Sequence, residues 1–272
     1  MSPRIRLTAA LLSISLTLAA PAAAQSADTI PPAQPVLESG DLVYAAGAAL
    51  ATLGAARIDR PAADFARTHG QNSVALQRAS HIAETIAIPG AFIIGGGLYV
   101  GGKIGDDDGM ADAGLHTTEA VLIASVLSGV VKFASGRARP YVSHDSSGDF
   151  QLMRGLHGDR YRSFPSGHTV IAFAMAAAAT QEVDRSGGPV WLVGAATYSG
   201  ATLVGLARMY HDMHWASDVV MGAAIGVFTG RRVVQWQHSH PGNRVDRWLL
   251  GVSVRSIGGG ERVVVPFVMP VM

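Results

Sequence analysis

Helix-length apolar segments separated by turn residues constrain this chain more than any other feature. They are rich in alanine and glycine, and charged residues make up only 15% of the chain, well below the roughly 25% of a typical soluble domain. Small side chains allow helices to pack closely, in water or in a membrane. We therefore predict an all-α fold, a bundle of about six core helices. The segments are Leu42–Ala56, Ile82–Val100, Thr117–Ala134, Thr169–Glu182, Val190–Met209 and Trp215–Val234, with a shorter amphipathic helix within Ala62–Ser80.

The two ends of the chain differ from this pattern. A basic start, an apolar run over Leu7–Ala20 and the small residues Ala22–Ala24 are typical of a secretory signal peptide over residues 1–24. Residues 25–41 then form a linker or arm, residues 42–234 the helical domain and residues 235–272 a C-terminal tail. Alternating valines around Gly258–Gly260 indicate a short β-hairpin or an extended tail.

Charge and cysteine content exclude several classes of function. The formal net charge is +1, so no electrostatic argument supports a nucleic-acid partner. The chain has no cysteine, which excludes disulfides, thiolate metal sites and a cysteine nucleophile. The oligomeric state is not indicated by any pattern.

Three polar clusters coincide with predicted helix ends. The first is Lys132-x6-Arg139-Pro140, the second is Pro165-Ser166-Gly167-His168, and the third is Arg208-x5-His214-x3-Asp218. In an up-and-down bundle these helix ends share one face, so the clusters can converge.

Phosphoryl transfer without a metal is the chemistry that requires this set of residues. Lys132, Arg139 and Arg208 can neutralise phosphate oxygens. Backbone N–H groups of Ser166, Gly167 and His168, at the start of a helix, can add donors. One histidine attacks phosphorus and the other protonates the leaving oxygen. Asp218 lies one helical turn after His214 and can hold its Nδ1–H, which leaves Nε2 free.

Together, the three clusters resemble the signature of the type-2 phosphatidic acid phosphatase (PAP2) superfamily, which includes bacterial class A acid phosphatases and vanadium haloperoxidases. The motifs span Lys132–Asp218, and residues before about Leu42 and after about Gln235 are not covered. The one departure is Ala207, where the family usually has serine. It removes a hydroxyl group beside Arg208 but no primary catalytic group.

The resemblance implies a role for each matched residue. His214 forms a phosphohistidine, Asp218 orients it, and His168 is the acid for the leaving group and then the base for water. Lys132, Arg139 and Arg208 bind phosphate, helped by Ser166 and Gly167. The implied substrate is a phosphomonoester, or a lipid phosphate or pyrophosphate. No cofactor is expected, and no set of side chains with convincing metal-ligand spacing is present.

Other residues in or outside the three motifs are interpreted as structural or solvent-exposed and not as part of the site. Arg137 is interpreted as a helix-end or surface charge, His211 and Asp212 as turn residues, and Trp215 as a packing residue. The acidic run Asp106–Asp108 lacks the spaced ligands of an EF-hand loop and is interpreted as a solvated turn. Tyr141–Ser163 is predicted to be a long loop that shapes substrate entry or is simply solvated.

Two other functions remain as alternatives. A vanadate-dependent haloperoxidase would use the same pocket, with His214 coordinating vanadate, although the chain is short for that branch. A non-catalytic membrane scaffold of Gly/Ala-rich helices would leave the charged helix ends unexplained.

The apolar segments approach the roughly 20 residues needed to span a bilayer. Together with the signal peptide, this gives the periplasmic side as the expected location. The protein is expected there either as a soluble or peripheral protein or as an inner-membrane protein with its site facing the periplasm. That orientation requires the signal peptide to be cleaved and Leu42–Ala56 to be too short to span; if this segment spans, the site faces the cytoplasm.

Overall fold

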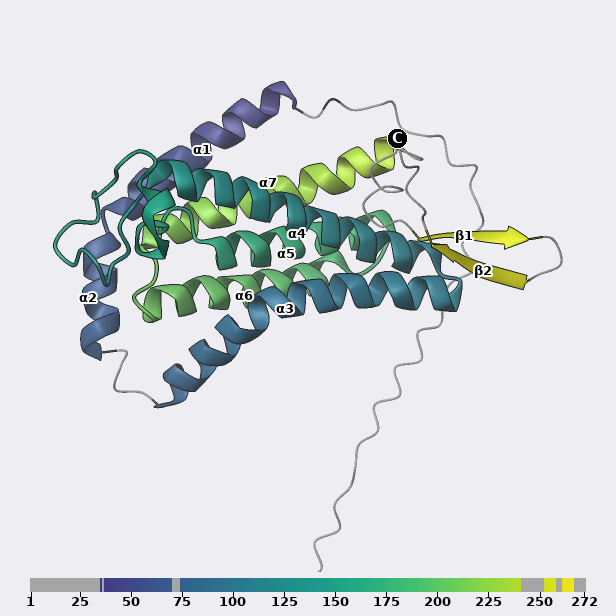
Figure 1. Cartoon of the computed structure of the whole chain (residues 1–272), viewed down its shortest axis with the longest axis horizontal. Coiled ribbons are helices and arrows are strands. Elements are labelled where there is room, and N and C mark those ends of the chain that lie inside the picture. Colours follow the sequence, from purple (N-terminus) through teal and green to yellow (C-terminus); the bar gives the residue numbers. More distant parts are fainter. Residues whose placement is uncertain (1–34, 36, 70–73, 241–251, 258–260, 267–272) are drawn as a thin grey trace, which may run out of the picture. The chain divides into compact units, whose positions relative to one another are not determined.

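The computed structural model describes residues 35, 37–69, 74–240, 252–257 and 261–266. The predicted signal peptide and most of the predicted linker lie outside these residues. Within them the all-α prediction is confirmed (Figure 1). The α-helices are α1 (Ser39–Ala56), α2 (Asp59–His69), α3 (Val74–Gly105), α4 (Asp108–Ser135), α5 (Gly167–Arg185), α6 (Val190–Tyr210) and α7 (Ala216–Ser239).

Helices α5 and α7 form the tightly packed centre of the bundle. A glycine recurs every fourth residue on α7, at Gly222, Gly226 and Gly230. A Cβ atom on Gly226 would lie 2.5 Å from the Val170 carbonyl oxygen, and one on Gly230 would lie 2.5 Å from that of Ala174. Only glycine permits this approach of two helix backbones, as in other small-residue helix contacts.

The outer helices expose large apolar side chains, whereas α5 and α7 contribute none to this set in the described part of the chain. Such a distribution is the reverse of a water-soluble bundle, in which extended apolar patches are rare. Three helical segments are long and apolar enough to cross a membrane, or four if the bent pair α1–α2 is one span. The exposed residues include Ile93, Ile94 and Leu98 on α3, Leu122, Val126 and Val130 on α4, and Trp191, Leu192, Leu203 and Leu206 on α6.

Several predicted helix boundaries are wrong, because helices continue through polar residues. The segment between the predicted helices Ile82–Val100 and Thr117–Ala134 is mostly helical: α3 ends at Gly105, and α4 begins at Asp108. Asp107 caps α4 by accepting a hydrogen bond from the Met110 N–H at 2.9 Å, so the acidic run is an exposed turn as expected. Helix α7 continues to Ser239, five residues beyond its predicted end at Val234 and into the predicted tail.

The remaining segments fit their predictions more closely. Residues 141–163 are largely irregular and hold two short 3₁₀ turns, η2 (Arg154–His157) and η3 (Asp159–Tyr161). In the tail, β1 (Val252–Ile257) pairs antiparallel with β2 (Glu261–Pro266), with Val254 opposite Val264. The hairpin alternative is therefore present in the described part of the tail.

Candidate active site

The three sequence clusters converge on one cavity of about 260 Å³ at the end of the bundle where α4 and α6 finish and α5 and α7 begin. Its lining brings together five of the predicted residues with side-chain functional groups, and Gly167. Ser166 and Asp218 are buried behind this lining. The lining residues are Ile88, Ser125, Ser128, Gly129, Lys132, Arg139, Asp159, Gly167, His168, Ile171, Arg208 and His214.

Each of the three cations is held by a neighbour. The Lys132 ammonium donates to the Arg162 carbonyl oxygen at 2.9 Å. Arg139 is buried, and it donates from Nε to the Asp159 carbonyl oxygen at 2.9 Å and from Nη2 to the Asp159 carboxylate at 2.8 Å. Their guanidinium and ammonium groups therefore reach the cavity wall with fixed orientations, as anion recognition requires.

Arg208 is also buried and forms an ion pair with Glu84 of α3. Its Nε atom has no hydrogen-bond partner among the described residues. A buried donor without a partner is costly, and an anion in the cavity would satisfy it.

The start of α5 supplies fewer free donors than the sequence predicts. The backbone N–H of Ser166 donates to the Asp218 carbonyl oxygen at 3.0 Å, so it is not available to a phosphate. Gly167 and His168 are the first residues of the helix, where N–H groups have no intrahelical acceptor. Glycine at 167 leaves room for Lys132, because a Cβ atom there would lie 3.1 Å from Cε of Lys132, a tight contact.

The orientation of His214 differs from the prediction. Its Nδ1 atom lies 2.7 Å from the Ser163 carbonyl oxygen but 3.6 Å from the Asp218 carboxylate, too far for a hydrogen bond. A carbonyl oxygen can only accept, so Nδ1 carries the proton and Nε2 keeps its lone pair. Asp218 instead holds the neighbours of His214: its carboxylate accepts from the Ser163 hydroxyl at 2.5 Å and from the Trp215 N–H at 2.8 Å.

Arg137 lies just after the end of α4 but is not a surface charge, so the surface alternative is wrong. It is 2% exposed and forms ion pairs with Asp218 and with Asp59 at the start of α2. Asp59 also accepts from the Ser217 N–H at 2.8 Å. This buried network ties α2 to the start of α7 beneath the cavity. The only sequence signal for it is the position of Arg137 inside the first motif.

The electrostatic setting keeps both histidines neutral before an anion binds. Burial lowers the pKa of His214 to about 3, with Lys132 and Arg139 adding to the effect against Asp218. Burial and the same two cations lower the pKa of His168 to about 4. A neutral His214 is suited to attack, whereas His168 requires a proton before it can act as an acid.

The other residues of these clusters lie close to where they were expected. Trp215 is buried and donates from Nε1 to the Ala138 carbonyl oxygen at 3.0 Å, which confirms packing. His211 and Asp212 form the turn after α6, where Asp212 accepts from Arg67 at 3.1 Å. The long loop is anchored by Arg154, which donates to the Gly136 carbonyl oxygen.

Comparison with known families finds a matching family model. The model of the PAP2 superfamily matches residues 113–241, just under half of the chain, and this segment contains all three motifs. The segment that carries the three motifs thus matches the PAP2 superfamily, which confirms the resemblance drawn from the sequence.

Individual relatives are similar over the same region. A lipid A 1-phosphatase of Porphyromonas gingivalis is 36% identical over 99 residues, covering 36% of this chain and 18% of the relative. A lipid A 1-phosphatase of Rhizobium johnstonii is 30% identical over 115 residues, covering 42% of this chain and 44% of the relative. The chain thus matches less than half of the length of each of these relatives.

A solved structure is also similar. The crystal structure of a transmembrane PAP2 type phosphatidylglycerolphosphate phosphatase from Bacillus subtilis aligns with a TM-score of 0.49 and 22% identity. The alignment covers 72% of this chain and 93% of the other.

Proposed function

We propose that this protein is a metal-independent phosphatase that hydrolyses lipid phosphates through a phosphohistidine intermediate. The observation that supports it is the cavity in which two neutral histidines face three cations. The cations neutralise the phosphoryl oxygens, a task that a metal ion performs in other phosphatases. The matched relatives are lipid A 1-phosphatases, which favours a lipid phosphate over a soluble phosphomonoester or a pyrophosphate.

The reaction has two steps in this site. His214 attacks phosphorus through Nε2, and the bond to the leaving oxygen breaks as His168 delivers a proton to that oxygen. The leaving alcohol departs, and water enters. His168 then takes a proton from water as it attacks phosphorus, and the P–N bond breaks. The products are inorganic phosphate and the original neutral His214.

The exposed apolar side chains of α3, α4 and α6 support insertion into a membrane. The cavity is lined by apolar residues of two helices, Ile88 of α3 and Ile171 of α5, beside the charged groups. A phosphate head group can therefore reach the cations while its acyl chains remain in the lipid. We propose an exported, integral inner-membrane protein with this site on the periplasmic side. Release from membranes by carbonate without detergent would contradict the insertion.

The activity is tested with the full chain purified in detergent. Phosphate release is measured from a lipid phosphate, from a lipid pyrophosphate, from a soluble sugar phosphate and from an aryl phosphate. We expect turnover of the lipid phosphate and the aryl phosphate, inhibition by vanadate, and no activity in His214→Ala. Unchanged turnover in this variant, folded as judged by circular dichroism, would overturn the assignment.

A further inference from the structure

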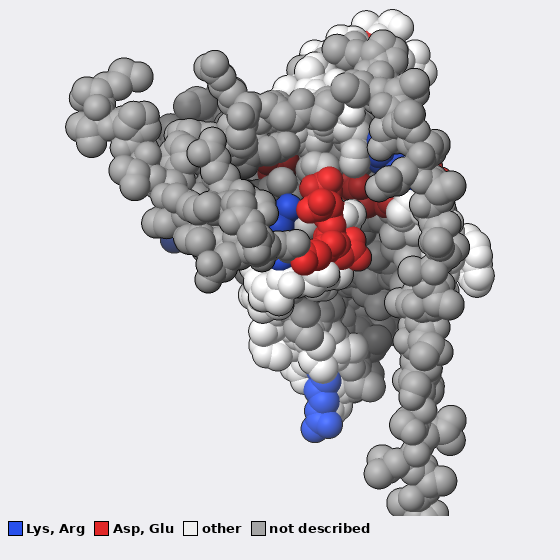
Figure 2. All heavy atoms as spheres, turned by 90° about the vertical axis from the view of Figure 1, so that its right-hand side faces the viewer, with Lys and Arg blue, Asp and Glu red and all other residues white. Residues whose placement is uncertain are grey.

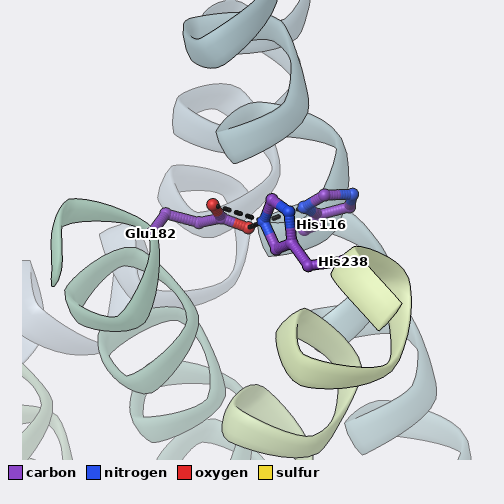
Figure 3. A group of neighbouring side chains, drawn as sticks. All are labelled: His116, Glu182 and His238. Carbon is purple, nitrogen blue, oxygen red and sulfur yellow. Dashed lines mark hydrogen bonds and ion pairs between the residues drawn. The ribbon is translucent and has the colours of Figure 1, made fainter. Parts of the chain in front are cut away.

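Three metal-ligating side chains meet at the end of the bundle opposite the candidate active site (Figure 3). His116 comes from α4, Glu182 from α5 and His238 from α7. Nδ1 of His116 lies 2.6 Å from the Glu182 carboxylate, and Nε2 of His238 lies 2.9 Å and 3.0 Å from its two oxygens. The three ligand atoms all lie within 4.8 Å of one another.

This cluster is separate from the phosphate cavity. Glu182 follows His168 by 14 residues on α5, which at about 1.5 Å per residue places it about 21 Å away. His238 follows Asp218 by 20 residues on α7, or about 30 Å on the same basis. The hydrolytic reaction therefore uses none of the three residues.

The chemistry of the cluster matches that of a transition-metal site. Two imidazoles and one carboxylate form the protein ligand set of known zinc sites that keep one further position open. His116 and Glu182 are 5% and 8% exposed, so they are largely shielded from water. The two imidazole rings meet edge to face, with centroids 4.9 Å apart, so their nitrogen atoms approach the carboxylate from different directions.

We propose that His116, Glu182 and His238 bind one divalent transition-metal ion, with Zn²⁺ the best match, that joins α4, α5 and α7. Ligand atoms around a tetrahedral zinc ion lie about 3.3 Å apart, given bonds of about 2.0 Å. The three hydrogen-bond contacts must therefore lengthen by less than about 1 Å to admit the ion. Imidazole nitrogens favour zinc over magnesium or calcium.

Asp112 is placed to attract the ion. It precedes His116 by one helical turn, is exposed, and interacts electrostatically with both His116 and His238. Figure 2 shows acidic side chains gathered on the described part of this face. The exposed acids include Asp106 and Asp107 in the turn before α4 and Asp108 at its first residue. Negative charge at this end raises the local concentration of cations.

Metal binding is tested on the full chain, carrying no histidine tag, in detergent. After treatment with a chelator and its removal, zinc is titrated by calorimetry, and the bound metal is counted by mass spectrometry. We expect one zinc ion per chain. Glu182→Gln and His238→Ala each weaken binding by at least tenfold, whereas His144→Ala, in the exposed loop, does not.

A ligand that binds only the folded state raises the unfolding temperature. Zinc should therefore raise the unfolding temperature of the wild type and of His144→Ala, but not that of Glu182→Gln or His238→Ala. If a variant does not fold, chemical modification of histidines in the wild type replaces it: zinc should protect His116 and His238 and leave His144 reactive. The proposal would be overturned if the wild type bound no zinc at micromolar concentrations, or if Glu182→Gln and His238→Ala bound zinc as tightly as the wild type. If those variants do not fold, a failure of zinc to protect His116 and His238 would overturn it.

Chelation also separates this proposal from the phosphatase assignment. Removal of the metal should lower the unfolding temperature without lowering the initial rate of phosphate release at temperatures well below unfolding. A rate that collapses on chelation would contradict the metal-independent mechanism but not the metal site.

Discussion

At the scale of single residues, the two histidines differ through their partners. The hydrogen bond from Nδ1 of His214 to the Ser163 carbonyl oxygen fixes its tautomer. No comparable bond to a backbone oxygen fixes His168 among the described contacts of the cavity. His168 gains a proton only when an anion offsets Lys132 and Arg139, the cations that lower its pKa along with burial.

The pH dependence of the reaction follows from these neutral histidines. The pKa of His168 is lowered to about 4, so above pH 5 the free protein carries no proton there. The proton must arrive with the monoanion of the substrate, whose second pKa is about 6. We expect kcat/KM to fall tenfold per pH unit above about pH 6. It should persist down to about pH 4, because the pKa of His214 is lowered to about 3. A profile that rises from pH 6 to pH 8 would contradict this account.

Asp159 competes with the substrate for Arg139. Its carboxylate is 65% exposed and lies 2.8 Å from Nη2 of Arg139. Replacing Asp159 by Asn removes the competing charge, and exposed ion pairs of this kind contribute about 0.2–1 kcal/mol. We expect inhibition by inorganic phosphate to tighten by up to about fivefold. Asp149→Asn, which removes the partner of Arg154 outside the cavity lining, is the control. Weaker inhibition in Asp159→Asn would show that Asp159 assists phosphate binding instead.

The convergence of several site residues could be predicted from the sequence, because the motifs coincide with the ends of predicted helices. Lys132, Arg139, His168, Arg208 and His214 do line one cavity. The role of Arg137 could not be predicted, because its partner Asp59 is 78 residues away in the sequence. The contact between His214 and the Ser163 carbonyl oxygen could not be predicted either, because every residue has a backbone carbonyl and the sequence does not indicate which one is used.

At the scale of helices, the glycines of α7 allow its backbone to lie close to that of α5, and both helices carry site residues. Ser166, at the start of α5, donates to the Asp218 carbonyl oxygen of α7, so the spacing of these two helices sets the distance between the motifs. Helix interiors were predictable from the apolar segments, whereas the bounds of several helices at the end away from the phosphate cavity were not. His116 lies just before the predicted start of one helix, and His238 lies beyond the predicted end of another. The truncated helices therefore concealed two of the three proposed metal ligands.

Gly226 is the most direct test of this contact between helices. An added Cβ atom would lie 2.5 Å from the Val170 carbonyl oxygen and 2.8 Å from Cβ of Phe173. We expect Gly226→Ala to cost about 1–3 kcal/mol of stability through overpacking and to lower activity as α5 and α7 separate. Gly200→Ala, on α6 with nothing within 4 Å of the new Cβ atom, should raise stability by up to about 1 kcal/mol. Thermal unfolding in detergent measures both, and equal effects would contradict the close-packing account.

At the scale of the whole molecule, the two proposed sites lie at opposite ends of the helical bundle. The loop at residues 141–163 belongs to the phosphatase end, since the Ser147 carbonyl oxygen accepts from Arg137. The turn between α3 and α4, at Asp106, belongs to the metal end. If the helices span the membrane, the two ends face different compartments.

The orientation can be measured because the chain contains no cysteine. Single cysteines are introduced at the exposed positions Ser146 and Asp106 and treated with a membrane-impermeant maleimide on spheroplasts. We expect Ser146→Cys to be labelled in intact spheroplasts, and Asp106→Cys only after lysis. The reverse pattern would place the phosphatase end in the cytoplasm, as the spanning of α1 after a cleaved signal peptide would require.

The covalent intermediate on His214 is the central claim, and His168→Ala provides the means to trap it. With an aryl phosphate, whose leaving group needs no protonation, this variant should form the phosphoenzyme but hydrolyse it slowly, because the base for water is missing. The reaction is quenched at alkaline pH, where phosphohistidine survives, and peptides are analysed by mass spectrometry. We predict one phosphoryl group on the peptide that contains His214, and none in the double variant that also carries His214→Ala. Phosphate release without any phosphorylated His214, or with the phosphoryl group on another residue, would contradict the account.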